Sequence, residues 1–216
     1  MKSYAFFDVD ETLIYSKSMF DFLYFWYEKQ NNLDEYFRQL KIIKKKASQG
    51  ASRTEINIFY YNQFKNTLLK DLISAGVEWF NIRLSAGGFF KYSITQELNK
   101  LKGNLIEPVF VSGSMIPVLQ PIADKLGVTH ILCTELKCHN DRLTGEIMSP
   151  TIGEFKRARI EKFIEINGRR DLNYYAFGDH ISDLPMLEYV KYPIAVDPCD
   201  ELLKIALSKG WRIIKS

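Results

Sequence analysis

Residues 4–14 read Tyr-Ala-Phe-Phe-Asp-Val-Asp-Glu-Thr-Leu-Ile, an apolar run that ends in two carboxylates near the start of the chain. The short, aromatic-rich run 4–7 predicts a buried strand. Asp8 and Asp10 fall where the strand gives way to a loop, and side chains two positions apart on a strand share a face. Two acids held together need a cation between them or a proton on one of them. They are therefore candidates for a metal or acid–base site, unless they only form a turn that Thr12 caps.

The composition is typical of a globular protein with a sizeable core. The chain has 216 residues, of which 46% are hydrophobic and 25% charged, and this length fits one domain with a large insert or two modest domains. A net charge of +3 is too mild to indicate nucleic-acid binding. Three cysteines without zinc spacing favour reduced thiols over a disulfide framework. With no leader-like segment and no bilayer-length apolar run, we expect a cytoplasmic monomer or homodimer without stable membrane association.

Hydrophobic periodicity divides the chain into a helical block and an alternating block. The helical block, 16–85, predicts helices at 18–29, 33–48, 52–64 (begun by Ser52 or Thr54) and 71–84. The remainder predicts helices at 94–102, 116–126, 157–167, 183–190 and 201–209. It also predicts strands at 108–111, 130–133, 174–177, 192–196 and 211–214, and a hairpin around 140–142.

Strands separated by helices of this length predict a parallel sheet. The first strand belongs to that sheet, so the helical block is an insert after it. We therefore predict an α/β protein with a three-layer, Rossmann-like core made of residues 1–15 and 86–216, and an all-α cap made of residues 16–85. The cap is rich in aromatic residues, which favours core packing over a pocket for an apolar substrate group or a membrane-touching face.

Polar clusters follow three of the predicted strands. The first contains Asp8 and Asp10, the second is Ser112-Gly-Ser after strand 108–111, and the third is Gly178-Asp-His-Ile-Ser-Asp after strand 174–177. Lys156 lies between the last two clusters at the start of a helix. Ligands of open parallel sheets bind at the carboxyl ends of the strands, so the topology brings all four features to one place. Taken singly, Ser112 is also consistent with a helix cap and Lys156 with a surface charge.

These motifs and their order resemble the haloacid dehalogenase superfamily, whose pattern is D-x-D-x-T, then Ser or Thr, then Lys, then G-D-x-x-x-D. The run 178–187, Gly-Asp-His-Ile-Ser-Asp-Leu-Pro-Met-Leu, and the run 193–198, Pro-Ile-Ala-Val-Asp-Pro, resemble its subfamily IB, the group that contains the phosphoserine phosphatases. The helical insert after the first motif looks like the C1 type of cap.

The resemblance implies a phosphoric monoester hydrolase that uses Mg²⁺ and acts on a small phosphorylated metabolite. Asp8 would be the nucleophile that forms an aspartyl-phosphate, and Asp10 the general acid and then the general base. Asp8, the backbone carbonyl of Asp10 and Asp179 would bind the metal, with Asp183 acting indirectly. Ser112, Gly113 and Lys156 would bind the phosphate.

The sequence indicates the substrate less clearly than it indicates the reaction. Lys17 stands nine residues after Asp8, where the phosphoserine phosphatases have an acid that binds the substrate's ammonium group, so we rank phosphoserine lower. Arg53 and His180 are further candidates for substrate contact, with exposed or indirect roles as alternatives. Other possibilities are a phosphotransferase or mutase with the same intermediate, a phosphoserine or lipid-phosphate phosphatase, a phosphorylated receiver module and a non-catalytic scaffold.

Overall fold

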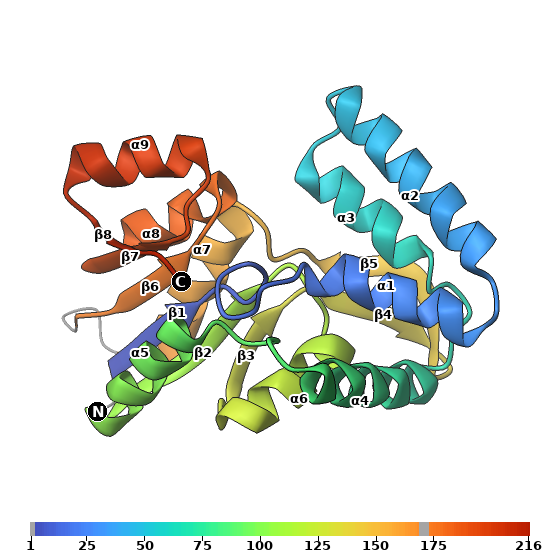
Figure 1. Cartoon of the computed structure of the whole chain (residues 1–216), viewed down its shortest axis with the longest axis horizontal. Helices are drawn as coiled ribbons and strands as arrows, with labels where there is room; N and C mark the ends of the chain where they lie inside the picture. The colour runs from blue at the N-terminus through green and yellow to red at the C-terminus, as the bar shows by residue number, and fades with distance from the viewer. Residues whose placement is uncertain (1–2, 169–172) are drawn as a thin grey trace.

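Strand β1 (Ser3–Phe7) lies near the middle of a six-stranded parallel sheet with the order β3-β2-β1-β6-β7-β8 (Figure 1). The computed structural model describes residues 3–168 and 173–216. The other strands of this sheet are β2 (Ile106–Ser112), β3 (His130–Cys133), β6 (Tyr175–Gly178), β7 (Tyr192–Val196) and β8 (Arg212–Ile214). The predicted α/β class and its parallel sheet are confirmed.

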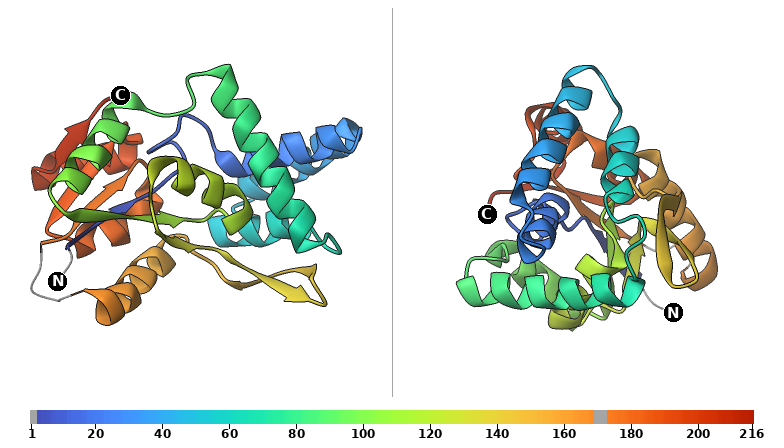
Figure 2. Two further views of the ribbon diagram at one scale, coloured as in Figure 1. Left: turned by 90° about the horizontal axis from the view of Figure 1, so that it is seen from below. Right: turned by 90° about the vertical axis from the view of Figure 1, so that its right-hand side faces the viewer.

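Helices cover both faces of the sheet, because β1 is apolar on both sides. Tyr4 and Phe6 pack into one buried cluster with residues of α7 (Glu154–Asn167), α8 (Leu184–Tyr189) and α9 (Asp200–Lys209). Ala5 and Phe7 pack into the other with residues of α5 (Tyr92–Gly103) and α6 (Ile116–Leu126). Alternate side chains of a strand point to opposite faces, so the result is three layers, as Figure 2 shows from a second direction.

Four helices separate β1 from α5: α1 (Ser18–Lys29), α2 (Leu33–Ser48), α3 (Arg53–Asn62) and α4 (Leu69–Ala86). Of the two residues predicted to cap this helix, Ser52 and Thr54, Ser52 caps α3 in a reciprocal capping box with Glu55. The aromatic side chains fill the space between these helices: Phe22 meets Trp79 edge to face at 6.0 Å, and both are fully buried. The aromatic run therefore packs in a core.

Several contacts join the helical insert to the rest of the chain, and two of them involve whole elements. Helix α4 packs against α6, so closely that a Cβ on Gly76 would lie 1.8 Å from the Pro117 carbonyl oxygen. The antiparallel hairpin of β4 (Glu135–His139) and β5 (Arg142–Ser149) meets the loop before α4, where the Asn66 amide donates to the Leu143 carbonyl at 2.8 Å. The division into a core of 1–15 and 86–216 and a cap of 16–85 remains our proposal.

Two predicted helices differ in their first turn. The helix predicted at 157–167 begins earlier, because α7 starts at Glu154. In place of a single helix over 183–190, a 3₁₀ turn, η1 (Ile181–Asp183), precedes α8. The Asp183 Oδ2 atom accepts hydrogen bonds from the Asp179 and His180 amides, each at 3.2 Å. These bonds fold the chain back on the end of β6, so a regular helix begins only after Asp183. Among the described residues, no helix combines the length and apolar character needed to cross a bilayer.

Candidate active site

A cavity of about 300 Å³ lies at the carboxyl ends of β1, β2 and β6, beneath the helical insert. All ten residues that the sequence nominates line this cavity: Asp8, Asp10, Lys17, Arg53, Ser112, Gly113, Lys156, Asp179, His180 and Asp183. The polar clusters after the strands thus meet at one edge of the sheet, as expected for open parallel sheets.

The loop after β1 folds tightly around its first residues. The Asp8 amide continues the pairing of β1 by donating to the Phe177 carbonyl at 2.9 Å. The Leu13 amide donates back to the Val9 carbonyl at 2.9 Å, and Glu11 adopts a left-handed φ of 56°. This turn directs the Thr12 hydroxyl to Asp179 Oδ1, at 3.0 Å. The loop therefore connects the acids of the first motif to those of the last.

Lys156 is the buried cation of the site. Its Nζ atom lies 2.5 Å from Asp8 Oδ1 and 2.7 Å from Asp183 Oδ1. The side chains of Lys156, Asp8 and Asp183 are 5%, 9% and 2% exposed, so these ion pairs are almost completely shielded from water. Charge-assisted hydrogen bonds are strong in such surroundings, and they fix the Asp8 carboxylate in one orientation.

The acids of the site hold protons more strongly than isolated carboxyl groups. Burial raises the pKa of Asp8 well above its usual range, helped by the charges of Asp183 and Asp179 and opposed by Lys156. Burial and the Asp8 charge raise the pKa of Asp10 to about 7. Burial and Asp183 raise the pKa of Asp179 to about 6. Burial alone would lower the pKa of Lys156, but Asp183 and Asp8 outweigh it and keep the ammonium charged.

The acids fit a divalent cation. Carboxylate oxygens of Asp8, Asp179 and Asp183 lie within 4.8 Å of one another, and all three residues are buried. Hard oxygen donors of this kind suit Mg²⁺. Both oxygens of Asp183 accept hydrogen bonds, Oδ1 from Lys156 and Oδ2 from backbone amides, and both oxygens of Asp8 are also engaged, Oδ1 by Lys156 and Oδ2 by the Thr12 hydroxyl at 3.4 Å. Oδ1 of Asp10 is buried with no hydrogen-bond partner among the described residues. Direct contact with a metal for Asp8 and Asp179 and an indirect role for Asp183 remain what the family resemblance implies.

The loop after β2 has the features of a phosphate cradle. Ser112 is 1% exposed, and its Oγ atom accepts from the Ser114 amide at 3.1 Å, which leaves its hydroxyl proton to donate. A Cβ on Gly113 would lie 2.8 Å from Ile152 Cγ1, so a residue larger than glycine would require the Ile152 side chain to shift.

The Gly113 carbonyl is an anchor that the sequence did not reveal. It accepts hydrogen bonds from Asn57 Nδ2 at 3.1 Å, from the Tyr61 hydroxyl at 2.8 Å and from Thr134 Oγ1 at 2.9 Å. Asn57 and Tyr61 stand one turn apart on α3, so they reach the same target. The only signal in the sequence is this spacing of two polar groups on a buried helix face. It gives no indication that their partner lies more than fifty residues away.

The remaining predicted residues surround the mouth of the cavity. Lys17 forms a 3.1 Å ion pair with Glu11, and Arg53 Nη1 donates to Ser182 Oγ at 2.9 Å. His180 Nδ1 accepts from the Ser182 amide at 3.1 Å, and burial together with the Arg53 charge lowers the pKa of His180. The Glu11 carboxylate therefore lies beside the Lys17 ammonium, so both signs of charge are present where the sequence predicts repulsion of an ammonium group.

The side of the cavity formed by the insert is mostly apolar. Met19 and Phe20 come from α1, Ile43 and Ala47 from α2, and Ile56 from α3. Helical periodicity identifies these residues as apolar, but it cannot separate the few that face a ligand from those that pack in the core.

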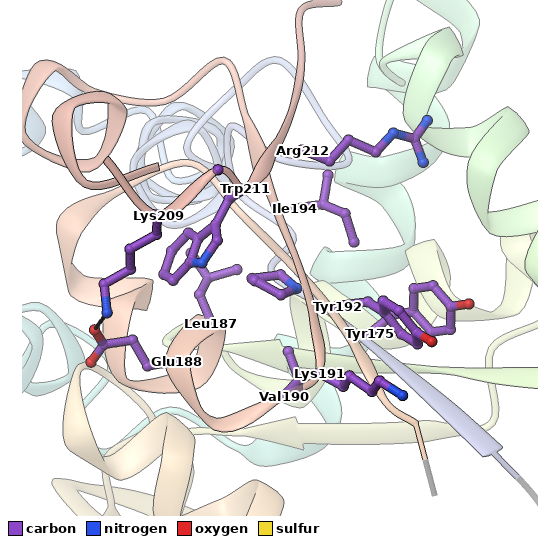
Figure 3. Close-up of a pocket in the computed structure, with 12 residues that line it drawn as sticks. Tyr175, Leu187, Glu188, Val190, Lys191, Tyr192, Ile194, Lys209, Trp211 and Arg212 are labelled. Atoms are coloured by element: carbon purple, nitrogen blue, oxygen red, sulfur yellow. Dashed lines mark hydrogen bonds and ion pairs between the residues drawn. The ribbon is translucent and has the colours of Figure 1, made fainter. Parts of the chain in front are cut away.

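A second pocket, of about 520 Å³, lies at the opposite edge of the sheet, near the first residues of β6 and β7. Figure 3 shows Trp211 on one side and Tyr175 with Tyr192 on the other. The ammonium of Lys209 pairs with Glu188 at 2.7 Å. The pocket residues include a single acid, Glu188, so this pocket offers no carboxylate cluster for the chemistry considered above.

Comparisons with known proteins agree with the geometry of the first cavity. The family model of haloacid dehalogenase-like hydrolases matches residues 5–188. A histidinol-phosphatase from Neisseria meningitidis is 27% identical, with 99% of each chain covered. A probable phosphatase from Mycobacterium tuberculosis is 36% identical over 106 residues, which span 49% of this chain and only 37% of that protein.

Solved structures share the fold. A protein of unknown function from Bordetella pertussis superposes with a TM-score of 0.88 at 22% identity, covering 99% of this chain and 98% of that one. A phosphoserine phosphatase solved as an analogue of its phospho-aspartyl intermediate superposes with a TM-score of 0.67 at 18% identity, covering 98% and 92%. The predicted resemblance to the phosphoserine phosphatases is thereby confirmed at the level of the fold.

Proposed function

Because this chain belongs to the haloacid dehalogenase-like hydrolase family, we propose that it is a Mg²⁺-dependent phosphomonoesterase acting on a small phosphorylated metabolite. The observation that carries this proposal is the buried cluster in which Lys156 contacts Asp8 and Asp183 and Thr12 contacts Asp179. Such a cluster suits phosphoryl transfer, which depends mainly on positioning and on neutralising charge.

The proposed reaction has two displacements at phosphorus. In the first, an Asp8 carboxylate oxygen bonds to phosphorus while the ester P–O bond breaks, and the Asp10 carboxyl proton passes to the leaving alkoxide. In the second, Asp10 takes a proton from water as the water oxygen attacks phosphorus and Asp8 is released. A pKa of about 7 for Asp10 suits this exchange of acid and base roles near neutral pH.

The chain's own residues supply one positive charge, that of Lys156, and neutral hydrogen-bond donors. Lys156 holds Asp8 in place and favours its ionised form, although burial opposes ionisation. The Ser112 hydroxyl and the Gly113 amide are placed to donate to phosphate oxygens. Mg²⁺ held by Asp8, Asp179 and the Asp10 carbonyl would add further positive charge at the phosphate.

The cavity fits a substrate with a small alcohol part. Its volume of about 300 Å³ is at the small end of ligand sites. The name of the Neisseria relative points to histidinol phosphate for that protein, and its 27% identity makes such a phosphorylated alcohol a first compound to test here. The Glu11–Lys17 ion pair leaves both ammonium-bearing and anionic alcohols as candidates.

Substitution of the nucleophile tests the proposal. Asp8→Asn should abolish Mg²⁺-dependent hydrolysis of an aryl phosphate, because a neutral amide does not form the acyl-phosphate, while the fold stays intact by circular dichroism. The control is Asp34→Asn, which changes an exposed acid on α2 and should leave activity unchanged. Full activity of Asp8→Asn contradicts the assignment of the nucleophile.

Product analysis separates hydrolysis from phosphoryl transfer. In the presence of an acceptor alcohol, a phosphatase should release inorganic phosphate in proportion to the substrate consumed. Transfer of most of the phosphoryl group to the alcohol would identify a phosphotransferase with the same intermediate.

A further inference from the structure

Lys91 is a buried lysine outside the phosphate cluster, 5% exposed. It occupies the last position before α5, at the end of the segment that returns from the helical insert. Its Nζ atom lies 2.6 Å from the Glu11 backbone carbonyl and 2.6 Å from Asp197 Oδ2. A buried ammonium requires such partners, and these come from two different loops.

The two connections between the sheet and the insert meet beside Lys91. The Lys91 amide donates to the Leu13 carbonyl at 2.9 Å, and the Tyr15 amide donates to the Phe89 carbonyl at 3.2 Å. Ile14 and Phe90 form an antiparallel bridge between these bonds. The two connections in this paired segment are the covalent links between the sheet and the insert. If the insert moves relative to the sheet, the backbone of this segment must therefore change conformation.

The Lys91 ammonium supports a strained part of the catalytic loop. Glu11 has a φ of 56°, a left-handed conformation that residues with a Cβ adopt only where their surroundings hold them. Glu11 lies between Asp10, the proposed general acid, and Thr12, which contacts Asp179. The Lys91 bond fixes the Glu11 carbonyl and with it the peptide plane between Glu11 and Thr12, and because Glu11 follows Asp10 directly, this also restrains the backbone that carries Asp10.

Asp197 holds the ammonium from the other side. It follows β7, its side chain is 31% exposed, and it also accepts a hydrogen bond from the Ser216 amide at 3.0 Å. The ammonium thus connects the end of β7 to the loop after β1, the paired segment and the start of α5.

We propose that Lys91 is a positioning residue that holds the Asp10–Thr12 part of the catalytic loop against the two connections of the insert. The proposal rests on the proposed function, in which Asp10 donates a proton to the leaving alkoxide. Without the Lys91 bond, the loop carrying Asp10 loses its fixed orientation, and the reactions that need this proton are slowed most.

Two leaving groups distinguish this role from a general loss of structure. A nitrophenolate leaves without protonation, whereas the alkoxide of glycerol 2-phosphate requires it. Lys91→Met should lower kcat/KM for glycerol 2-phosphate by about 10²-fold, the lower range of general acid contributions, and that for p-nitrophenyl phosphate by a much smaller factor. Lys91→Arg should restore part of the difference.

The matched control is Lys102→Met. Lys102 also donates to backbone carbonyls, those of Leu126 and Gly127 at 2.9 and 3.2 Å. It is exposed, however, and its partners lie at the end of α6 and not in the catalytic loop. It should change neither substrate's kcat/KM. Equal loss for both substrates in folded Lys91→Met, or no loss, overturns the proposal. If Lys91→Met does not fold, the same comparison is made with Asp197→Asn. A wild-type ratio of kcat/KM for glycerol 2-phosphate to kcat/KM for p-nitrophenyl phosphate in that variant overturns the proposal.

Hydrogen exchange tests Lys91 independently of activity. Amides of residues 11–13 should exchange faster in Lys91→Met than in the wild type, and at the wild-type rate in Lys102→Met. A wild-type protein that hydrolyses no phosphomonoester contradicts the proposed function alone. Unchanged exchange in Lys91→Met contradicts the role of Lys91 alone.

Discussion

At the residue scale, the site is a balance of buried charges. Asp8 and Asp183 share one ammonium, that of Lys156, and Asp179 adds a further carboxylate within the same cluster. Removing one partner of a buried ion pair leaves the others uncompensated. The lysine therefore compensates the buried acids, and in the proposed reaction it also presents a positive charge to the phosphate.

Lys156→Met is expected to lower kcat/KM for an aryl phosphate by about 10²–10³-fold, the range seen when one donor to a developing anion is removed. Inhibition by inorganic phosphate should weaken at the same time, because bound phosphate and the transition state both carry negative charge that the Lys156 ammonium would attract. Lys162→Met, a change on the exposed face of the same helix, serves as the control. Unaltered phosphate inhibition in Lys156→Met would place the lysine outside the phosphate site.

The residues of the cavity differ in how well a sequence can identify them. Asp8, Ser112 and Asp179 follow strands whose carboxyl ends must meet, so topology alone brings them together. Asn57 escapes such reasoning because its partner is a backbone carbonyl, that of Gly113, and backbone groups leave no trace in residue identity. Arg53 lines the cavity, but its hydrogen bond to Ser182 depends on how the insert packs over the sheet, and its contact with a substrate stays a prediction.

At the element scale, the contact between α4 and α6 determines how the insert is attached. Gly76 lies in the middle of α4, where glycine weakens a helix by about 1 kcal/mol relative to alanine. The approach of the Pro117 carbonyl explains its presence, since any side chain there would overlap that oxygen. Propensity predicts this helix, but no property of a single helix predicts the crossing that requires the glycine.

Gly76→Ala should destabilise the protein by about 1–3 kcal/mol, the usual range for overpacking, measured as the free energy of unfolding in urea. Gly103→Ala is the matched control, because α5 ends there with nothing within 4 Å of the added Cβ. It should leave stability equal or slightly raised. Equal effects of the two substitutions would show that α4 and α6 do not meet as described.

Most predicted elements were correct because their signals are local. The helices 18–29, 33–48 and 116–126 begin and end where periodicity and flanking residues place them. The helix predicted at 183–190 instead opens with a 3₁₀ turn, because the Asp183 carboxylate bonds to amides at the end of β6. A functional side chain there overrides helix propensity, and a single sequence does not show that competition.

At the scale of the whole molecule, the fold gathers its acids where the sheet meets the insert. The arrangement opposes ionisation: burial raises the pKa of Asp10 to about 7 and that of Asp179 to about 6, and it raises the pKa of Asp8 as well. The unfolded chain has ordinary carboxyl groups, so between pH 4 and 7 the folded protein binds more protons than the unfolded chain. Stability from these groups is therefore greatest at low pH and is lost as pH rises.

The metal-free protein should accordingly lose stability on the order of a few kcal/mol between about pH 4 and 7, since each unit of pKa shift is worth about 1.4 kcal/mol. His180, with its lowered pKa, acts in the opposite direction but is only half-buried.

Mg²⁺ at about 100 times its Kd should add ~2.7 kcal/mol to the free energy of unfolding. This gain should restore most of the lost stability at the upper end of the pH range, where the acids are ionised. Thermal unfolding with and without Mg²⁺ measures both effects. Asp10→Asn removes one titrating acid, so its metal-free Tm should fall less steeply with pH. A metal-free Tm that rises from pH 4 to 7 would mean that the acids are not buried together.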